Sequence, residues 1–176
     1  MKRNWLLILG GVIIVVLVVI LLAAPSKPKV VISDFGSCAA AGHVIMESYP
    51  PQCAADGKTY TQDIGDELNK ADQVKLTNLP ANTTVKSPLE IEGQAKGPWF
   101  SEASLPVKLV DDKGNPLAEA IAQAQADSMT SDFVPFKVSL TFNLPVGVTK
   151  GNLVFEKDNP SGDAANAESF RLPVKF

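Results

Sequence analysis

Cys38 and Cys53 are the only cysteines of the chain, and His43, its only histidine, lies between them. A redox-active pair usually has two residues between its cysteines, and a structural zinc ion needs four ligands, so redox and metal chemistry are the weaker interpretations. We expect the two cysteines to form a structural disulfide. That bond closes a loop of 16 residues and stabilises the fold by roughly 3 kcal/mol, because it restricts the unfolded chain.

The other residues with chemical potential do not form a catalytic set. A nucleophilic triad would have to use His43, which we expect to be exposed or partly packed, with a pH-sensitive contact as its one possible role. Acidic residues lie close together in predicted loops, at Asp111 and Asp112, Asp127 and Asp132, and Asp158 and Asp163. None has calcium-loop spacing, and nothing marks the sugar cleft of a paired-carboxylate glycosidase. We predict solvated turn residues, no enzyme, and no catalytic, cofactor or metal site.

Trp99 and Phe100 follow Gly97 and Pro98 and are candidates for contact with a partner. Tryptophan dominates the energetics of many interfaces, so an exposed aromatic pair here would anchor a partner. The other interpretation places Trp99 in the core of the fold, as its plug. The sequence does not separate the two.

An apolar run of 20 residues at positions 5–24, WLLILGGVIIVVLVVILLAA, contains no charge. As a helix it reaches about 30 Å, the thickness of the hydrocarbon core of a bilayer. A cleaved signal peptide has a shorter apolar core, and Pro25 directly follows the candidate cleavage site. A lipoprotein needs a cysteine just after the run, whereas the first is Cys38. We therefore predict an uncleaved transmembrane signal anchor.

The side of the membrane on which the remaining chain lies follows from weaker signals. Lys2 and Arg3 precede the run, and Lys27 and Lys29 follow it, so positive charge alone does not decide. The short tail at 1–4 is easily kept in the cytoplasm, and a lone cysteine pair suits an oxidising compartment. We expect a single-pass protein of the cell membrane whose C-terminal body is extracytoplasmic.

The charge of the chain limits its partners. The formal net charge is −3, and the body beyond the apolar run lacks the two cations Lys2 and Arg3 and is more acidic still. An acidic body disfavours nucleic acid and electrostatic docking on anionic lipid. Besides the membrane, we expect an envelope protein or a cell-wall component as the partner.

The chain divides into units at changes of composition. The stretch at 25–33 contains Pro25 and Pro28, which favour extended backbone, and is the predicted linker. A small unit at 34–65 holds both cysteines, and a spacer at 66–72 is long enough for one or two helical turns. The remaining residues, 73–176, are enough for one compact domain.

The predicted domain consists of strands with alternating apolar and polar residues, which places each apolar set on one face. The clearest alternation is at 89–96, 136–144 and 169–176, and weaker strands are at 74–78, 106–111, 117–126 and 151–157. Segment 117–126, LAEAIAQAQA, has a helical composition, and only the surrounding pattern favours a strand. Pro173 lies inside the last strand, so one edge of that strand should be unpaired there.

Turn residues separate these strands, as at Lys113-Gly114-Asn115-Pro116. Seven short strands with one apolar face each need a second sheet to cover them. We therefore predict an all-β domain, an immunoglobulin-like β-sandwich of about seven strands, behind the transmembrane helix and the small disulfide-stapled unit. The domain contains no cysteine, so packing alone must hold its core.

The segment GPWFSEASLPVKLVDDKGNPLAEAIAQAQADSMTSDFVPFKVSLTF, at 97–142, resembles the immunoglobulin-like domain of bacterial spore germination, the second Gmad-type family. The resemblance covers about residues 74–176, and its most specific positions are Trp99, Glu102, Phe133, Pro135 and Phe136. The chain departs from the pattern at Ser101, where an aromatic residue is expected, and at Ser128, where a tryptophan is expected. The resemblance implies an extracytoplasmic, all-β, non-catalytic module.

Residues 38–60, CAAAGHVIMESYPPQCAADGKTY, resemble a short cysteine-bearing unit of bacterial envelope proteins. The tail CAADGKTY also echoes Kazal-type protease inhibitors, but that family needs about three disulfides and this chain has two cysteines. We therefore expect a membrane-anchored binding or assembly module of a bacterial cell envelope, with an unknown ligand. The alternative is a regulator or inhibitor of an extracellular hydrolase, acting through residues 38–60.

Overall fold

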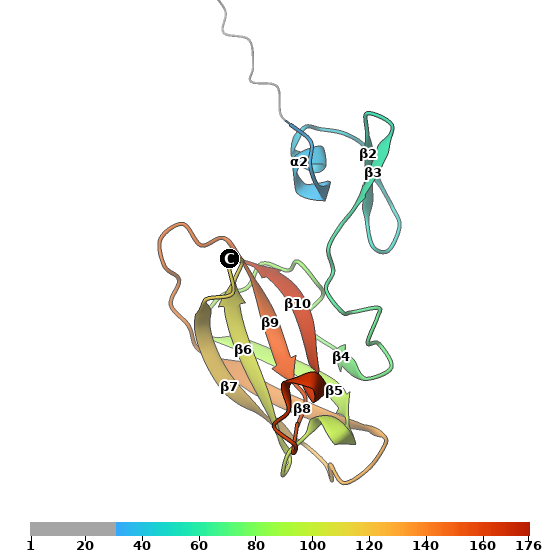
Figure 1. The fold of residues 1–176 in the computed structure, drawn as a ribbon. Coiled ribbons are helices and arrows are strands. Elements are labelled where there is room, and N and C mark those ends of the chain that lie inside the picture. Colours follow the sequence, from blue (N-terminus) through green and yellow to red (C-terminus); the bar gives the residue numbers. More distant parts are fainter. Residues whose placement is uncertain (1–30) are drawn as a thin grey trace, which may run out of the picture.

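The computed structural model describes residues 31–176. The predicted tail at 1–4, the predicted membrane span at 5–24 and most of the predicted linker at 25–33 lie outside them. Among the described residues, no helix combines the length and the apolar character that a bilayer crossing requires. Figure 1 shows a small N-terminal unit beside a larger all-β body. We call residues 34–65 the disulfide unit and residues 73–176 the C-terminal domain.

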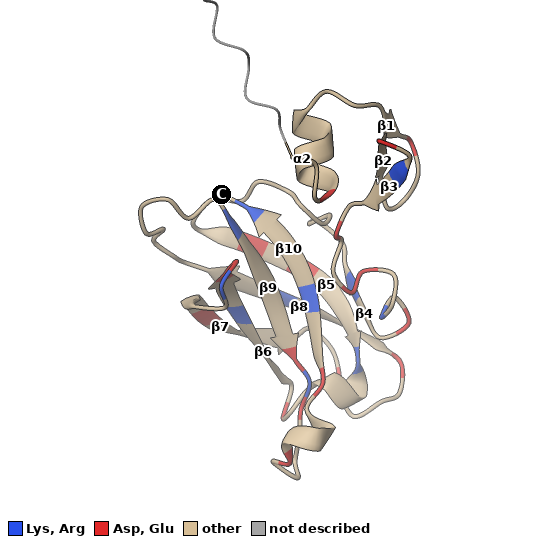
Figure 2. Cartoon of the chain, turned by 45° about the horizontal axis from the view of Figure 1, so that its top comes forward, with Lys and Arg blue, Asp and Glu red and all other residues tan. Residues whose placement is uncertain are grey.

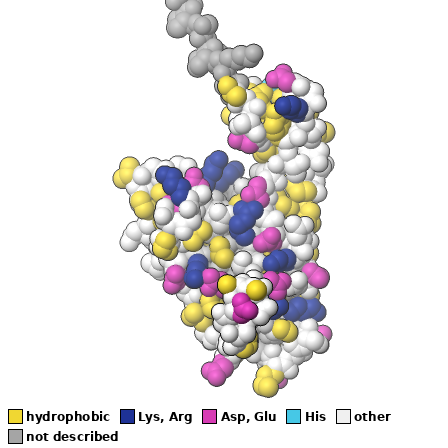
Figure 3. Space-filling model, viewed as in Figure 1, with side chains coloured by type: hydrophobic (Ala, Val, Ile, Leu, Met, Phe, Trp, Pro, Cys, Tyr) yellow, Lys and Arg dark blue, Asp and Glu magenta, His cyan; other side chains and the backbone are white. Residues whose placement is uncertain are grey.

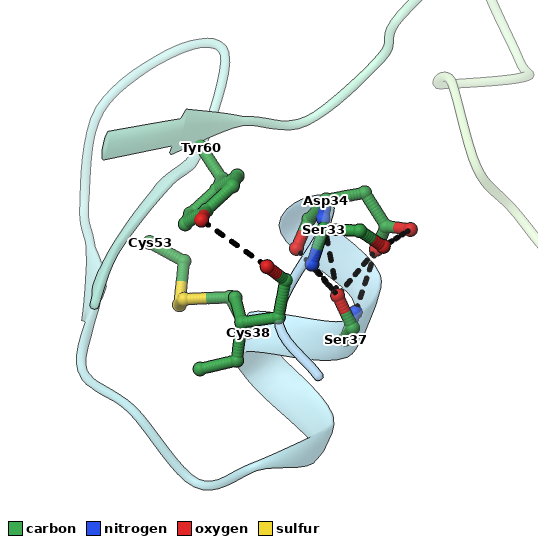
Figure 4. Close-up of a disulfide and its surroundings, with 7 residues drawn as sticks. Ser33, Asp34, Ser37, Cys38, Cys53 and Tyr60 are labelled. Carbon is green, nitrogen blue, oxygen red and sulfur yellow. Dashed lines mark hydrogen bonds between the residues drawn. A yellow bond between two sulfur atoms is a disulfide. The ribbon is translucent and has the colours of Figure 1, made fainter. Parts of the chain in front are cut away.

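The disulfide unit begins with one short helix, α2 (Phe35–Ala40). The helix starts here because Asp34 caps it: the Ser37 backbone N–H donates to Asp34 Oδ1 at 2.7 Å, and the Asp34 N–H donates to Ser37 Oγ at 3.1 Å. This reciprocal pair is a capping box, and it is drawn in Figure 4. The bond from the Ser37 N–H also lowers the pKa of the Asp34 carboxyl.

Three short antiparallel strands complete the unit, in the order β1 (Ile45–Met46), β2 (Gln52–Ala55) and β3 (Lys58–Thr61). Asp56 and Gly57 join β2 to β3, with φ of 50° and 74°. Positive φ at both positions gives the two-residue turn whose twist matches an antiparallel hairpin, and Asp-Gly is a preferred pair for it.

The predicted disulfide is confirmed. Cys38 of α2 is bonded to Cys53 of β2, with a Cα–Cα distance of 6.1 Å, and both are fully buried. With Ala55 they are the only buried residues of this small core, against which Ile32, Phe35 and Tyr60 pack. The Tyr60 hydroxyl donates to the Ile32 carbonyl at 3.3 Å, which ties β3 to the start of the unit (Figure 4).

The C-terminal domain is all-β, apart from two short 3₁₀ turns at Gly97–Trp99 and Ala164–Asn166. Its strands are β4 (Val74–Leu76), β5 (Leu89–Lys96), β6 (Ser104–Asp111), β7 (Pro116–Ala124), β8 (Phe133–Leu140), β9 (Lys150–Glu156) and β10 (Ser169–Lys175). Residues 65–73, which include the segment that connects the two units, form hydrogen-bonded turns, and the Lys70 N–H donates to the Asp66 carbonyl at 2.9 Å, the spacing of a single helical turn.

The seven strands form one antiparallel sheet, in the order β10-β9-β6-β7-β8-β5-β4. Only the end of β7 pairs with β8, at two positions, so the sheet folds over there into two layers, and Figure 1 shows β5 and β8 behind β6 and β9. Thr84 then bridges Lys175 in parallel and brings the two ends of the sheet back together. We predicted that a second sheet covers the apolar faces. In the structure, the two layers are instead parts of the same sheet, which is nearly closed on itself.

The core lies between the two layers. Strands β5, β6 and β8 alternate between buried and more exposed residues, as a period of two requires. Phe136 of β8 lies 5.6 Å from Phe155 of β9, and Phe155 lies 5.9 Å from Phe170 of β10, centroid to centroid. These tilted rings fix the two layers against each other.

Two strands differ from the sequence prediction in detail. Segment 117–126 does form a strand, β7, but only Ala122 of it is buried. Pairing with β6 along its length overrides the helical composition. The strand expected at 136–144 instead begins at Phe133 and ends at Leu140, and although Phe142 is still buried, Leu144 is exposed.

Loss of the disulfide should unfold the disulfide unit and leave the C-terminal domain intact. The unit buries only three residues in its own core, and Cys38→Ser with Cys53→Ser should destabilise it by roughly 3 kcal/mol. Hydrogen exchange measured by mass spectrometry on the full-length protein should then accelerate in residues 34–61 alone. Ala54→Ser, an exposed change in the same strand, is the control. Unchanged exchange in the double variant would contradict the prediction.

Candidate binding site at the junction of the two units

A groove of about 640 Å³ lies between the disulfide unit and one end of the C-terminal domain. The helix α2 and residues 61–63 form one wall, and the ends of β9 and β10 form the other. Figure 3 shows this hollow, with basic and acidic side chains along its edge. We call it the junction groove.

Arg171 of β10 joins the two walls. Its guanidinium donates two hydrogen bonds to the Asp63 carboxylate, at 2.7 and 2.9 Å, and a third to Asn152 Oδ1 at 2.8 Å. A planar guanidinium matches a carboxylate in this two-bonded geometry, which is more directional than a lysine contact. The pairing lowers the pKa of Asp63 and raises that of Arg171.

The chain between the two units follows the outer edge of β10. The Asp66 N–H donates to the Arg171 carbonyl and the Arg171 N–H donates to Asp66 Oδ2, each at 2.8 Å. Further along, the Asn82 N–H donates to the Pro173 carbonyl at 2.7 Å, and its side-chain amide donates to the Asp63 carbonyl at 2.7 Å. The two units are thus held together by backbone as well as by side-chain contacts.

Gly65 permits this close approach. Its φ is +67°, and a Cβ at this position would lie 2.1 Å from the Arg171 carbonyl oxygen. A side chain would therefore meet backbone and be strained by its φ as well. The glycine fixes the distance at which the disulfide unit sits against β10.

Charged side chains of both signs line the junction groove. Lys150 and Lys175 lie on the domain side, Asp112 follows β6, and Asp34 lies at the start of α2. All four are exposed, and within residues 31–176 none of them forms an ion pair. Figure 2 shows basic ribbon near the C-terminus, at the end of the domain nearest α2.

This arrangement suits binding. Exposed ammonium and carboxylate groups along the groove can make charge-assisted hydrogen bonds to a polypeptide laid along it. In the described part of the chain, no cluster of three or more histidine, cysteine or acidic side chains is placed to hold a metal ion. The exposed charges of the groove make it a candidate binding surface.

Trp99 and Phe100 do not form a partner surface in this structure, which corrects that interpretation. Their exposed fractions are 1% and 7%, and both belong to the core cluster of the domain. Trp99 Nε1 donates to Gln73 Oε1 at 3.3 Å, so even its polar atom is satisfied internally. The core interpretation describes both residues.

The other candidate residues hold local structure. His43 is exposed. Asp111 is buried and accepts hydrogen bonds from the Asn115 side chain and from the Asn115 and Lys113 backbones, which shape the β6–β7 turn. The bond from the Asn115 side chain, first, and then the two backbone bonds lower the pKa of Asp111. Asp163 accepts from the Ala165 N–H at 2.9 Å and caps the second 3₁₀ turn.

Sequence reasoning missed the residues that build the junction. Arg171 and Asp63 are 108 positions apart, and nothing in their local sequence pairs them. Pro173 gave a partial signal, because a proline inside a strand marks an edge. β10 is the end strand of the sheet, but the edge that we predicted to be unpaired is covered, because the Pro173 carbonyl accepts from the Asn82 N–H. An edge strand needs a cover, and that cover is the chain that leads from Asp63 to Thr84.

The fold and its packing define an immunoglobulin-like domain without a disulfide of its own, attached to a disulfide-stapled unit. The family model described as the immunoglobulin-like domain of bacterial spore germination, Gmad2, matches residues 73–164, more than half of the chain. The chain belongs to this family, as its resemblance indicated. The match ends before β10, although β10 completes the same sheet. No curated protein matches the chain, and neither does any solved structure.

Acid should weaken the junction. Because Arg171 lowers the folded-state pKa of Asp63, this carboxylate stabilises the fold at neutral pH, and the contribution disappears as the pH falls from about 4 through the lowered pKa. Both side chains are partly exposed, so the effect should be at most about 1 kcal/mol. Denaturant unfolding of the full-length protein in detergent, from pH 7 to pH 3, measures it.

Asp63→Asn should lower stability at pH 7 and lose this part of the acid dependence, so that its difference from the unaltered protein shrinks toward pH 3. Asp72→Asn, an exposed change in the same connecting segment, is the control. A difference that stays constant with pH would show that the ion pair is not responsible.

Proposed function

We propose that this protein is a membrane-anchored, non-catalytic binding or assembly module of a bacterial cell envelope, with its body outside the cytoplasmic membrane. The observation that carries the proposal is the junction groove itself. A member of an immunoglobulin-like family is clamped by Arg171 and Asp63 to a second, disulfide-stapled unit, so that two units present one surface.

The compartment is inferred from the sequence and from the disulfide. The uncharged run at 5–24 is long enough for a membrane anchor. A structural disulfide persists in oxidising compartments and is rare in the cytosol. Both support an extracytoplasmic body on a single span, and the family description places related domains in bacteria.

The proposed partner is an envelope protein that presents a polypeptide segment with charges of both signs. Lys150 and Lys175 would face its carboxylates, and Asp34 and Asp112 would face its cations. Complementary charges of this kind set specificity and the rate of association more than raw affinity. The volume of about 640 Å³ admits several side chains of such a segment.

Crosslinking in the native membrane tests this proposal. A photo-crosslinking amino acid at Gln62, which lines the groove, should capture one major envelope protein. Lys150→Glu with Lys175→Glu should lower the yield about tenfold, since reversal of two contacting charges weakens binding by about 1.4 kcal/mol.

The control for this experiment has the same change of net charge. Lys58→Glu with Lys86→Glu alters two exposed lysines that do not line the groove, and its crosslinking should match that of the unaltered protein. Equal yields from both double variants, with the fold intact by circular dichroism, would reject the groove as the binding surface.

One observation favours a second function, the regulation of an extracellular hydrolase. Residues 44–49 of the disulfide unit are exposed throughout. They include Val44 and Tyr49, which are 78% and 58% exposed, and the disulfide restrains the loop to which they belong. Under this alternative, a crosslinker at Ser48 would capture a hydrolase and one at Gln62 would not.

A further inference from the structure

A second hollow, of about 300 Å³, lies where the two end strands of the sheet face each other. Val74 and Leu76 of β4 line it on one side, and Phe170 and Leu172 of β10 line it on the other. It shares no lining residue with the junction groove. We call it the seam pocket.

The walls of the seam pocket are apolar and continuous with the core. Val74, Phe170 and Leu172 are each at most 1% exposed and belong to the core cluster of the domain. Leu68, from the connecting segment, is 52% exposed and also lines the pocket. The surface thus offers a guest a body of aliphatic and aromatic contacts.

One carboxylate oxygen of the lining has no partner. Glu67 Oε2 is the only buried side-chain nitrogen or oxygen within residues 31–176 that makes no hydrogen bond. An unpartnered buried acceptor is unfavourable, so this oxygen can take a hydrogen bond from a guest in addition to the neighbouring Tyr49 hydroxyl. Tyr49 stands beside it, and burial together with the Glu67 carboxylate raises the pKa of the Tyr49 hydroxyl to about 12.

Two lysines of this region, Lys70 and Lys75, contact other groups. Lys75 lines the pocket, but its ammonium lies 4.5 Å from the centre of the Phe133 ring. Lys70 donates to the Ser169 carbonyl at 2.5 Å and pairs with Glu168 at 3.8 Å. Within the described residues, neither lysine forms an ion pair with Glu67.

We propose that the seam pocket binds a protonated primary amine on an aliphatic stem, in the form of a lysine side chain of the partner protein. The ammonium donates to Glu67 Oε2, and the methylene stem packs on Leu68 and Leu76, the leucines of the lining that are not fully buried. Lysine stems bury well along apolar surfaces while their charged end keeps a polar partner. An anion would be repelled, and a purely apolar guest would leave the oxygen unpartnered. The proposal that the pocket binds an amine depends only on the pocket. The proposal that the amine belongs to a partner protein rests on the proposed function.

Binding of small probes tests the chemistry. The full-length protein in nanodiscs is titrated with Nα-acetyl-lysine methylamide and with the norleucine analogue, which lacks the ammonium, and methyl NMR shifts of Val74, Leu76 and Leu172 are followed. We expect a dissociation constant on the order of 1 mM for the lysine probe, since a small ligand gains little per atom, and at least about tenfold weaker binding of norleucine.

Glu67→Gln should weaken binding of the lysine probe until its affinity equals that of the norleucine probe. Glu47→Gln, an exposed change of the same type outside the pocket, should leave its binding unchanged. Equal binding of both probes, or full lysine binding by Glu67→Gln, would overturn the amine site.

The source of the amine is tested separately in the membrane crosslinking experiment. Under the proposal, Glu67→Gln lowers the yield of the major product from the Gln62 crosslinker, and Glu47→Gln does not. If the lysine probe binds as expected but the yield is unchanged, the partner's lysine is rejected while the groove and the proposed function stand. If the crosslinked partner is absent altogether, the proposed function fails and the probe titration still decides the pocket.

Discussion

The outer edge of β10 is the constraint on which the rest of this structure depends. An end strand presents a row of backbone donors and acceptors that must be satisfied or shielded, because otherwise they pair with other chains. Here every second residue from Ser169 to Lys175 turns to that edge, and each finds partners in the chain between Asp63 and Val85. Pro173 belongs to this row, so the donor that it lacks is removed from the outer edge and not from the ladder with β9. The chain that covers this edge follows directly after the disulfide unit, so the cover also fixes the position of the disulfide unit.

Both hollows of the molecule follow from the same cover. Where the chain leaves the disulfide unit at Asp63 and meets Arg171, the unit is held beside the ends of β9 and β10, and the junction groove forms between them. Where the chain then turns through Glu67 toward β4, it spans the gap between the two end strands without filling it, and the seam pocket remains. A nearly closed sheet keeps one seam, and at this seam apolar side chains of the core and the Glu67 carboxylate line the same hollow.

Much of the fold of the domain can be predicted from local sequence patterns, whereas the junction between the two units cannot. Alternation with a period of two places Ile91, Phe136 and Phe170 in the core, and pattern alone finds their strands. For residues 117–126, helical propensity and strand pairing favour different structures. The segment forms a strand because it pairs with β6 over most of its length. The sequence identified Trp99 as a notable residue but left open whether it is buried in the core or exposed to a partner. That choice depends on tertiary packing, which a single sequence does not show. The contact of Asp63 with Arg171 joins positions 108 residues apart, and a single sequence carries no local signal for it.

The chemistry of the junction differs from that of the core in a way that bears on function. The domain is held by buried apolar side chains, whereas the disulfide unit is held to it by an ion pair and hydrogen bonds, which are partly exposed and weakened by salt. Polar interfaces between units generally open at a smaller free energy than an apolar core does. A partner that entered the proposed groove would act on polar, partly exposed contacts and would leave the apolar core of the domain intact. This separation lets a binding surface vary in charge while the immunoglobulin-like domain beneath it keeps the same packing.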